Sequence, residues 1–502
     1  MSIPPRRPLD YPIGDPVQVL PQPPRSLLFT FCRRESGRTE IPWDGTRQRL
    51  SAAMVEESLV TRSTAPVAAV EVAVQPSRAI GPKILLYSHD TFGLGNIHRT
   101  LLVAEALTGA LPGAAVLIVT GSPVIHALRI PDGIDYVKLP CLDRVAAERY
   151  QPRFLSSWSD GVKRMRRDIL RKAALGFDPD LVIVDKRATG VDGELLGTLA
   201  ALRRLRRSPR IVLGLRDILD EPARTRHALA KSHAFATIER YYDEVWVYGT
   251  PVVFDTVREY GFPEAVARKT AFCGYLRTRT EGRPSNGGAP RVLVTTGGGG
   301  DGSDVVEAYL EGLLGLPRRF ALRTTIVFGP QMPESRRTRI LERFGVIPDV
   351  AFFDFEPDLG RRYAEADVVV SMAGYSTVCE LLSSRRRAVL VPRAEPVREQ
   401  LIRARRFADL GYFDLVEPGQ LTPERLIRKV LAALRRDVAS VPSVDLGGLP
   451  RIVERARVLL REGTRDAGAG RGPSGPPTPI TTRRSSNRSR PKHAGALPST
   501  ST

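Results

Sequence analysis

Long apolar segments and paired cysteines are both lacking in this chain of 502 residues. The four cysteines, Cys32, Cys141, Cys273 and Cys379, are scattered without the spacing of a metal or redox site, so we expect a reduced, intracellular protein. The longest apolar runs, such as DVVVSMAG and RAVLVP, have the length of buried strands. Because we find no signal peptide and no run long enough to cross a bilayer, the sequence predicts a cytoplasmic location.

Acidic side chains are also in short supply relative to basic ones. The chain has 75 lysines and arginines against 55 aspartates and glutamates, which gives a net charge of +20. A basic balance indicates anionic partners such as nucleotides, nucleic acid or acidic lipid. The alternative is an arginine bias spread over solvated faces, because net charge bears on non-specific binding and not on the fold.

Both ends of the chain lack the periodicity of helices and strands. Residues 1–80 read as a proline-rich, low-complexity N-terminal extension, and residues 464–502 as a basic low-complexity tail. Segments of this composition bury too little apolar surface to offset the entropy of ordering. We therefore expect both to be extended or disordered.

Between the ends, short β-branched runs alternate with amphipathic helices. One series of strand candidates begins with KILLYSH and ends with KTAFCGY, and a second begins with RVLVTTGGGG and ends with FDLVEP. Runs that are apolar on both faces indicate a parallel sheet covered on both sides by crossover helices. The stretch RTRTEGRPSNGGAP separates the two series. The sequence therefore predicts an α/β protein with two doubly wound Rossmann-like domains, 81–285 and 286–440, and a closing helix at 441–463 that packs back on the first domain.

Four consecutive glycines, Gly297, Gly298, Gly299 and Gly300, follow the strand RVLV and precede a helix. Glycines let the backbone approach a ligand closely and adopt positive φ. Their N–H groups and the N-terminus of the next helix can form an anion site. No GK[ST] follows, so this is not a P-loop, and a flexible turn is the alternative.

The stretch SMAGYSTVCELL places a small-residue turn after another strand. We expect a helix to begin near Tyr375, with Ser376 and Thr377 in the first turn, where hydroxyl and N–H groups can hold a diphosphate. Glu380, about one turn further on, could accept hydrogen bonds from both ribose hydroxyls. A capping box followed by a solvated glutamate is the alternative.

The segment RAEPVREQLIRARRF follows the strand RAVLVP. Gln400 could bind sugar hydroxyls, with Glu399 and Arg403 nearby. An ordinary charged helix face is the alternative.

The order of these motifs resembles the donor domain of a family 28 glycosyltransferase. The glycine-rich turn is followed by FFDFE, then by MAGYSTVCE, and then by PxxxxxREQ. The family includes the peptidoglycan N-acetylglucosaminyltransferase and the galactolipid synthases, and the resemblance covers about Lys83 to Glu462. It implies a GT-B fold, in which two Rossmann-like domains face a cleft and the C-terminal domain holds a nucleotide-sugar.

The resemblance also assigns donor-side roles by motif. It implies that the four glycines lie near the phosphates, that the segment after Phe353, with Phe355, contacts the base, and that Glu380 binds the ribose. The sugar would be bound by Glu399 and Gln400. The diphosphate would be held by Ala373, Gly374, Tyr375, Ser376 and Thr377.

The loop GLGNIHR lies where such enzymes carry GxGH. It matches the glycines, Gly93 and Gly95, but Asn96 stands at the usual histidine position. Asparagine can donate a hydrogen bond to a phosphate but cannot act as a base near neutral pH. His98 is then a candidate base, with His89 and Asp90 at the strand end as alternatives. For each histidine a structural role is the competing interpretation.

Two more strand ends are predicted to lie at the same edge. Asp185 ends LVIVD, and Arg216 with Asp217 ends VLGLRD. These side chains could shape the acceptor pocket or supply a carboxylate base, with helix N-capping as the alternative for the DILDE segment. We identify no metal cluster, and the resemblance implies a reaction without a bound metal or other cofactor.

Three functions follow from these patterns. The first is a hexosyltransferase that uses a nucleotide-sugar, expected to be a UDP-sugar, and a small-molecule, glycan or lipid acceptor, with inversion. The second is an epimerase or hydrolase of the same fold. The third is a non-catalytic protein that binds nucleotide-sugar or RNA, favoured by Asn96 and the basic tail, although the lack of aromatic-rich RNA motifs argues against nucleic acid.

The arginine-rich segment VKRMRRDILRKAA, near Val162, reads as a helix. It could contact anionic lipid as a peripheral element at the inner face of the membrane. A solvated helix face is the alternative.

Overall fold

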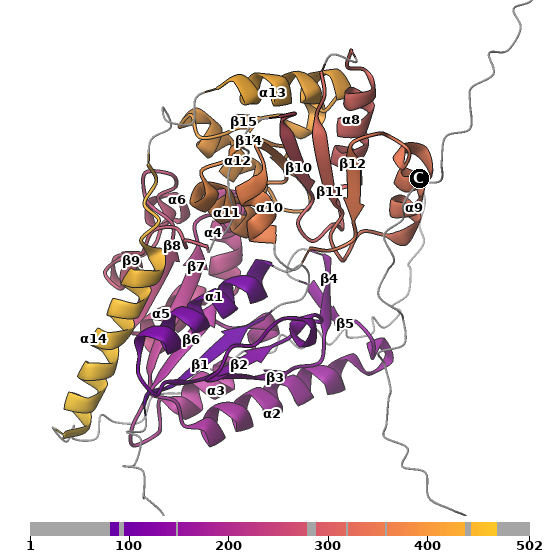
Figure 1. Cartoon of the computed structure of the whole chain (residues 1–502). Coiled ribbons are helices and arrows are strands. Elements are labelled where there is room, and N and C mark those ends of the chain that lie inside the picture. Colours follow the sequence, from indigo (N-terminus) through magenta and orange to yellow (C-terminus); the bar gives the residue numbers. More distant parts are fainter. Residues whose placement is uncertain are drawn as a thin grey trace, which may run out of the picture. The chain divides into compact units, whose positions relative to one another are not determined.

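The computed structural model describes residues 81–89, 95–146, 149–278, 288–317, 320–356, 359–436 and 443–468. All of these belong to one compact unit, which spans residues 74–502 (Figure 1). The predicted N-terminal extension, the predicted boundary at 285 and most of the predicted C-terminal tail lie outside the described residues.

The first sheet contains seven parallel strands in the order β3-β2-β1-β6-β7-β8-β9. Their bounds are β1 Lys83–Ser88, β2 Ala115–Thr120, β3 Ile134–Lys138, β6 Leu181–Asp185, β7 Arg210–Arg216, β8 Glu244–Tyr248 and β9 Thr270–Phe272. The order reverses between β1 and β6. The loops that follow these two strands therefore meet at the carboxyl edge of the sheet, where open α/β sheets bind ligands.

Helices cover both faces of this sheet: α1 Gly95–Ala110, α2 Ser159–Phe177, α3 Leu196–Leu202, α4 Pro222–Lys231, α5 Ala234–Tyr241, α6 Thr256–Tyr260 and α7 Glu264–Ala267. Successive residues of β1 point to opposite faces, so Leu86 packs in one core with Ile97 of α1, and Leu85 packs in another with Leu170 of α2. Two buried faces are the reason why the strand is apolar at successive positions.

A short antiparallel hairpin, β4 Leu142–Ala146 and β5 Arg149–Pro152, precedes α2. The sequence did not predict it, because its strands are short and rich in charged and polar residues. The exposed segment 153–158 then leads into α2 through a 3₁₀ turn at Ser156–Trp158.

The second sheet contains six parallel strands in the order β12-β11-β10-β13-β14-β15. Their bounds are β10 Arg291–Thr295, β11 Arg323–Val327, β12 Val350–Phe353, β13 Val368–Ser371, β14 Arg387–Leu390 and β15 Asp414–Leu415. The covering helices are α8 Ser303–Leu314, α9 Glu334–Phe344, α10 Leu359–Glu365, α11 Tyr375–Ser384, α12 Glu399–Asp409 and α13 Pro423–Arg435. Here the order reverses between β10 and β13, so the glycine-rich loop and the start of α11 share one edge.

The last helix, α14 Gly448–Gly468, returns to the first half of the chain. The guanidinium of Arg455 donates to both carboxylate oxygens of Glu244 in β8, at 2.8 and 2.9 Å, and Arg457 donates to the carbonyl oxygen of Ala110 at the end of α1. A single antiparallel bridge pairs Leu276, on the way into the second half, with Gly447, on the way out. The prediction that the closing helix packs back on the first domain is confirmed.

The predicted α/β class with two doubly wound parallel sheets is confirmed. The predicted closing helix continues past Gly463 to Gly468. Within the described residues, every helix falls short of the length and apolar character that a bilayer-spanning segment requires.

Candidate functional site

The glycine-rich loop lies at the carboxyl end of β10 and packs against the loop after β11. The backbone φ is +66° at Gly297 and +90° at Gly299. A Cβ atom on Gly299 would lie 2.3 Å from the carbonyl oxygen of Phe328, so this position requires glycine. Nothing described lies within 4 Å of a Cβ built on Gly297. Gly297, Gly298 and Gly300 are partly exposed, so a ligand can approach their backbone.

The first turn of α11 is a second element suited to an anion. Gly374 is its N-cap, and no described side chain caps the helix. The first N–H groups of a helix have no partner within it and carry partial positive charge, so this turn can hold a phosphate. Ser376 and Thr377 are partly exposed there. The Ser376 hydroxyl donates to the carbonyl oxygen of Gly95 at the start of α1, over 3.3 Å.

Glu380 lies on α11, one turn beyond Ser376. Burial raises the pKa of Glu380 to about 7, an effect that the nearby hydroxyl of Tyr363 partly offsets. The carboxyl group is therefore close to half ionised at neutral pH. Hydrogen bonds donated by ribose hydroxyls would favour its ionised form.

The ring of Tyr375 is buried between three other side chains. It stacks on Tyr275 with ring centroids 6.0 Å apart, and the guanidinium carbons of Arg99 and Arg403 lie 5.6 and 5.8 Å from its centroid. The side chain thereby joins α1, α11 and α12. The ring of Tyr375 is therefore packed inside the protein and is not available to a diphosphate. A diphosphate could contact this residue only through its backbone N–H group.

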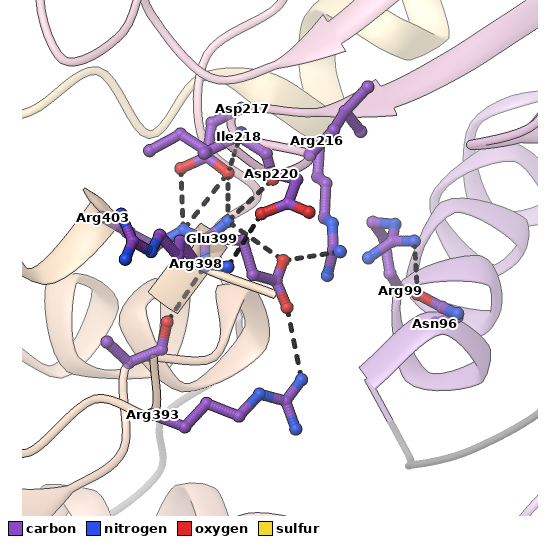
Figure 2. A network of polar contacts seen from close by, with 12 residues as sticks. Asn96, Arg99, Arg216, Asp217, Ile218, Asp220, Arg393, Arg398, Glu399 and Arg403 are labelled. Carbon is purple, nitrogen blue, oxygen red and sulfur yellow. Dashed lines mark hydrogen bonds and ion pairs between the residues drawn. The ribbon is translucent and has the colours of Figure 1, made fainter. Parts of the chain in front are cut away.

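Glu399 and Gln400 begin α12 and are both buried. Figure 2 shows the Glu399 carboxylate between arginines from both halves of the chain. It lies 2.5 Å from Arg216 Nη2, 3.5 Å from Arg393 Nη2 and 3.9 Å from Arg403 Nη2. Burial alone would raise the pKa of Glu399, but these cations hold it at about 2. In this arrangement Glu399 is an ion-pair partner and does not present a free carboxylate to a sugar.

Asp217 is fully buried and is the main partner of Arg403. The Arg403 guanidinium donates to Asp217 from Nη2 at 2.7 Å and to the carbonyl oxygen of Ala373 from Nη1 at 3.0 Å. The hydroxyl of Tyr275 donates to the other carboxylate oxygen of Asp217 at 2.9 Å. Burial opposes the charge of Arg403, but the Asp217 carboxylate outweighs this and raises its pKa. Asp217 is therefore not free to act as a base.

Arg99, at the start of α1, forms hydrogen bonds to two of the residues that were predicted to face the acceptor. Its guanidinium donates to both oxygens of Asp185, at 2.7 and 2.8 Å, and to Asn96 Oδ1 at 3.0 Å. Asp185 is thus also committed to an ion pair. Since the Asn96 oxygen is occupied, the group that Asn96 can offer to a ligand is its NH₂ donor.

Two histidines lie beside this loop. His98 is exposed on α1, and the neighbouring protein lowers its pKa by desolvation. His89, at the end of β1, is buried and its Nδ1 has no hydrogen-bond partner among the described residues. Burial lowers the pKa of His89 well below its usual value, and the charges of Lys186 and Arg187 lower it further. Asp90 and Gly93, which were also predicted to contribute, lie outside the described residues.

Phe355 follows β12 and is 40% exposed, as a base-stacking surface requires. Sequence reasoning missed Arg393, which reaches Asp301 beside the glycine loop at 2.9 Å as well as Glu399. The only sequence signal for it was its place after a strand. Among the described residues, no group of three or more His, Cys, Asp or Glu side chains is arranged to hold a metal ion.

Comparison with known families identifies the second half of the chain. Residues 292–440 match the glycosyltransferase family 28 C-terminal domain. This stretch contains the second sheet, the glycine-rich loop, and helices α11 and α12. The predicted resemblance to family 28 is confirmed for this part of the chain.

Curated relatives are similar over limited stretches. A UDP-N-acetylglucosamine--N-acetylmuramyl-(pentapeptide) pyrophosphoryl-undecaprenol N-acetylglucosamine transferase of Haemophilus influenzae (strain PittGG) is 25% identical over 174 residues, 34% of this chain and 48% of that protein. The protein of the same name from Anaeromyxobacter dehalogenans (strain 2CP-C) is 32% identical over 159 residues, 31% of this chain and 39% of that protein. The chain spans between about a third and two thirds of the length of the curated relatives it matches, 33% to 64%. The solved structure of Acinetobacter baumannii MurG shares 16% identity at a TM-score of 0.47, over 76% of this chain and 99% of that chain.

Proposed function

We propose that this chain, with its family 28 C-terminal domain, is a glycosyltransferase that moves a hexosyl group from a UDP-sugar to a hydroxyl group of a lipid-linked acceptor. The observation that carries the proposal is the contact between Ser376, in the first turn of α11, and Gly95, at the start of α1. Two helix N-termini converge there, one from each half of the chain. Diphosphate chemistry is favoured where two such termini supply N–H donors and positive potential.

On the donor side, the N–H groups of the α11 first turn and of Gly297 to Gly300 would stabilise the negative charge that develops on the leaving diphosphate. Such preorganised donors lower the barrier because they need no rearrangement as charge develops. Glu380 would accept the ribose hydroxyls, and Phe355 would stack on the base. Positive potential from backbone donors makes a reaction without a bound metal chemically reasonable.

On the acceptor side, His98 is the best-placed base. It is the exposed histidine of the α1 loop, whereas the carboxylates of Asp185 and Asp217 are held in buried ion pairs. His98 would take the proton of the acceptor hydroxyl as that oxygen attacks the anomeric carbon from the face opposite the diphosphate. Attack on that face gives inversion. The Asn96 NH₂ group would donate to an acceptor phosphate.

The surroundings of His89 favour an acceptor with an anionic group. The charges of Lys186, Arg187, Arg99 and Arg216 all lower the pKa of this histidine, so cations gather at the carboxyl edge of the first sheet, where Arg99 and Arg216 are paired with Asp185 and Glu399. A cavity of about 120 Å³ adjoins Lys186 and Arg187, and apolar side chains such as Leu213, Phe235 and Ile238 line it. Cations beside an apolar cavity suit a phosphate attached to an apolar chain, and the names of the curated relatives specify a pyrophosphoryl-undecaprenol acceptor.

A lipid-linked acceptor calls for contact with a membrane, and the segment before α2 offers it. Phe154, Leu155 and Trp158 are 75, 48 and 52% exposed. Exposed basic side chains follow on α2, at Arg164, Arg167, Arg171 and Lys172. Aromatic anchors beside a basic helix face suit an anionic membrane surface, so we assign the protein to the inner face of the cytoplasmic membrane as a peripheral protein. Arg166, by contrast, is buried and donates to Glu194 at 2.6 Å.

The test begins with donor binding. Thermal shifts are measured with UDP, GDP, dTDP and their sugars for the wild type, for Glu380→Ala and, as a control, for Glu342→Ala at an exposed glutamate on α9. We expect a shift with UDP ligands that is lost in Glu380→Ala and kept in Glu342→Ala. Absence of any nucleotide shift would refute the donor site. Sugar transfer to a sugar unit linked to a short-chain polyprenyl diphosphate, whose hydroxyl groups can accept the hexosyl group, then separates a transferase from a hydrolase, which releases UDP without acceptor.

A further inference from the structure

A second cavity lies at the opposite end of α11 from the proposed donor site. It has a volume of about 300 Å³, and its walls come from the last turn of α11, the start of β14, the residues before β15 and the end of α13. These elements lie together in the second half of the chain in Figure 1. Since α11 has ten residues, its two ends are about 15 Å apart. The cavity is therefore a separate place from the glycine loop.

Five arginines line this cavity, and they come from distant parts of the chain: Arg277, Arg385, Arg386, Arg387 and Arg436. Arg387 and Arg436 are tied to the fold, because Arg387 Nε donates to the carbonyl oxygen of Arg436 at 2.7 Å and Arg436 lies 3.5 Å from Asp414. Arg277 and Arg385 are exposed and form no ion pair within the described part of the chain. Arg386 Nε is buried and has no hydrogen-bond partner among the described residues.

Carboxylates do not balance this charge. No described residue that lines the cavity is acidic. Asp414 is shared between Arg436 and Lys429, at 3.5 and 3.7 Å, and Asp367 interacts with Arg386 while also accepting from the backbone N–H of Arg291. Burial lowers the pKa of Arg386, and the charge of Arg387 lowers it further. A surplus of positive charge in a partly buried space is costly unless an anion compensates for it.

The floor of the cavity is apolar. Leu381 and Leu382 of α11 are buried there, together with Tyr412 and Phe413, and Val444 and Leu446 complete the lining. An inorganic anion would leave this floor in contact with water. A ligand with an apolar or aromatic body would cover it and gain from the burial.

We propose that this cavity binds a phosphate ester with a small apolar or aromatic body, whose phosphate lies among the arginines and whose body lies on the Leu381–Leu382 and Tyr412–Phe413 floor. A phosphate group is favoured over a single carboxylate because it carries nearly two negative charges and accepts bidentate hydrogen bonds from several guanidinium groups. The volume is at the lower end of the range for small-molecule sites, which suits a mononucleotide or a short isoprenyl phosphate.

The place of the cavity gives the site a structural consequence. Arg277 lies on the segment that enters the second half of the chain, and Val444 and Leu446 lie on the segment that leaves it. The backbone N–H of Thr278 also donates to Ser383 Oγ, at 3.0 Å, in the last turn of α11. A bound phosphate ester would therefore connect both crossing segments to the helix whose other end lies at the proposed donor site. The binding itself does not depend on the proposed transferase activity.

The test uses the full chain and calorimetric titration with three probes: inorganic phosphate, uridine monophosphate and geranyl monophosphate. The double variant Arg277→Gln/Arg385→Gln removes the two exposed arginines without breaking a described ion pair. The double variant Arg336→Gln/Arg339→Gln removes two exposed arginines from α9 and serves as the matched control. All titrations are made in a Glu380→Ala background, in which nucleotide binding at the proposed donor site is expected to be lost.

We expect one of the two esters to bind at least tenfold more tightly than inorganic phosphate. That affinity should fall at least tenfold in Arg277→Gln/Arg385→Gln and remain in the α9 control. Tighter binding of the uridine ester would identify a nucleotide as the source of the phosphate, and tighter binding of the geranyl ester a lipid. Equal affinity in both double variants, equal affinity of inorganic phosphate and the esters, or no binding of either ester would overturn the proposal.

Discussion

Arg403 and Asp217 are 186 positions apart in the chain, and their side chains meet where neither is exposed to water. Asp217 follows the strand β7 of the first sheet, and Arg403 lies on α12 beside the second. The pair is the centre of a network that also holds Arg216 and Glu399, as Figure 2 shows. The two halves of the chain are therefore joined by buried charge as well as by apolar packing.

Removing Arg403 should be costly. We expect Arg403→Met to lower the free energy of unfolding by about 3–5 kcal/mol, because it leaves the Asp217 carboxylate buried without its partner. Urea denaturation measures the change. Arg405→Met is the matched control on the same helix, since Arg405 pairs with Glu417 at 2.7 Å on an exposed surface and such pairs contribute about 1 kcal/mol or less. Similar losses in the two variants would contradict the importance of the buried network.

Glu380 should make stability depend on pH. Its folded pKa of about 7 is above its ordinary value of 4.5, so the native state holds a proton that the unfolded chain releases. The stability that this carboxyl group contributes is complete below about pH 4.5 and is lost as the pH rises through about 7. Glu380→Gln has no such proton. The free energy of unfolding of the variant, taken relative to that of the wild type, should therefore rise by up to ~3 kcal/mol between pH 5 and pH 8. Denaturation midpoints that differ equally at both pH values would refute the shifted pKa.

The same group should control donor affinity. If ribose hydroxyls bind the ionised carboxylate, the affinity for UDP-glucose should rise about tenfold between pH 6 and pH 8, following the ionised fraction of a group with a pKa of about 7. UDP-glucose is the suitable probe because its diphosphate does not titrate in this range. Glu380→Gln should bind with an affinity that is nearly independent of pH. A wild-type affinity that is flat with pH would remove Glu380 from the ribose site.

His98 and His89, the two histidines beside the start of α1, should differ in their effect on turnover. With the donor found by the thermal-shift panel, we expect His98→Gln to lower kcat by about 10²–10⁴-fold with little change in the KM for the donor, as for loss of a general base. His89→Gln should instead leave kcat nearly unchanged, because the His89 ring is buried and the cations around it keep it uncharged. Loss of kcat in His89→Gln alone would transfer the role of base to that residue.

The exposed aromatic residues before α2 should control membrane binding. We expect Phe154→Ser/Trp158→Ser to weaken binding to vesicles of phosphatidylcholine and phosphatidylglycerol by more than tenfold, because two apolar anchors are lost. Val252→Ser, at a position 78% exposed, is the control for a general loss of surface apolarity. Co-sedimentation with vesicles measures the effect. Equal binding of all three proteins would remove this segment from the membrane contact.

Local patterns were sufficient to predict the parallel strands of both sheets and the start of α11 at Tyr375. In these segments the apolar run and the turn residues lie next to each other in the chain, so local sequence carries the information. The β4–β5 hairpin was missed, because four- and five-residue strands that mix charged, polar and apolar residues give little periodic signal.

Side-chain partners were beyond local prediction. Glu399 was assigned to a sugar and Tyr375 to a diphosphate because their motifs resemble a known family. The structure places Glu399 against Arg216, from a strand of the other sheet, and places the Tyr375 ring between Arg99 and Arg403. Nothing in the sequence near Glu399 indicates Arg216, because such pairs form only when the two halves of the chain come together. The arginines of the second cavity were not identified from the sequence for the same reason, since they come from distant parts of the chain.

The bridge between Leu276 and Gly447 has a consequence for how this protein can be divided. Because the chain enters and leaves the second half at neighbouring points, that half is an insertion, and the first half is a discontinuous domain that α14 completes. Residues 276 and 447 are already neighbours in the native fold. Joining them directly would therefore give a continuous chain for the first domain without moving either residue far. The second sheet with its helices is thus a cassette, which could be exchanged for a related one while both of its attachment points are kept.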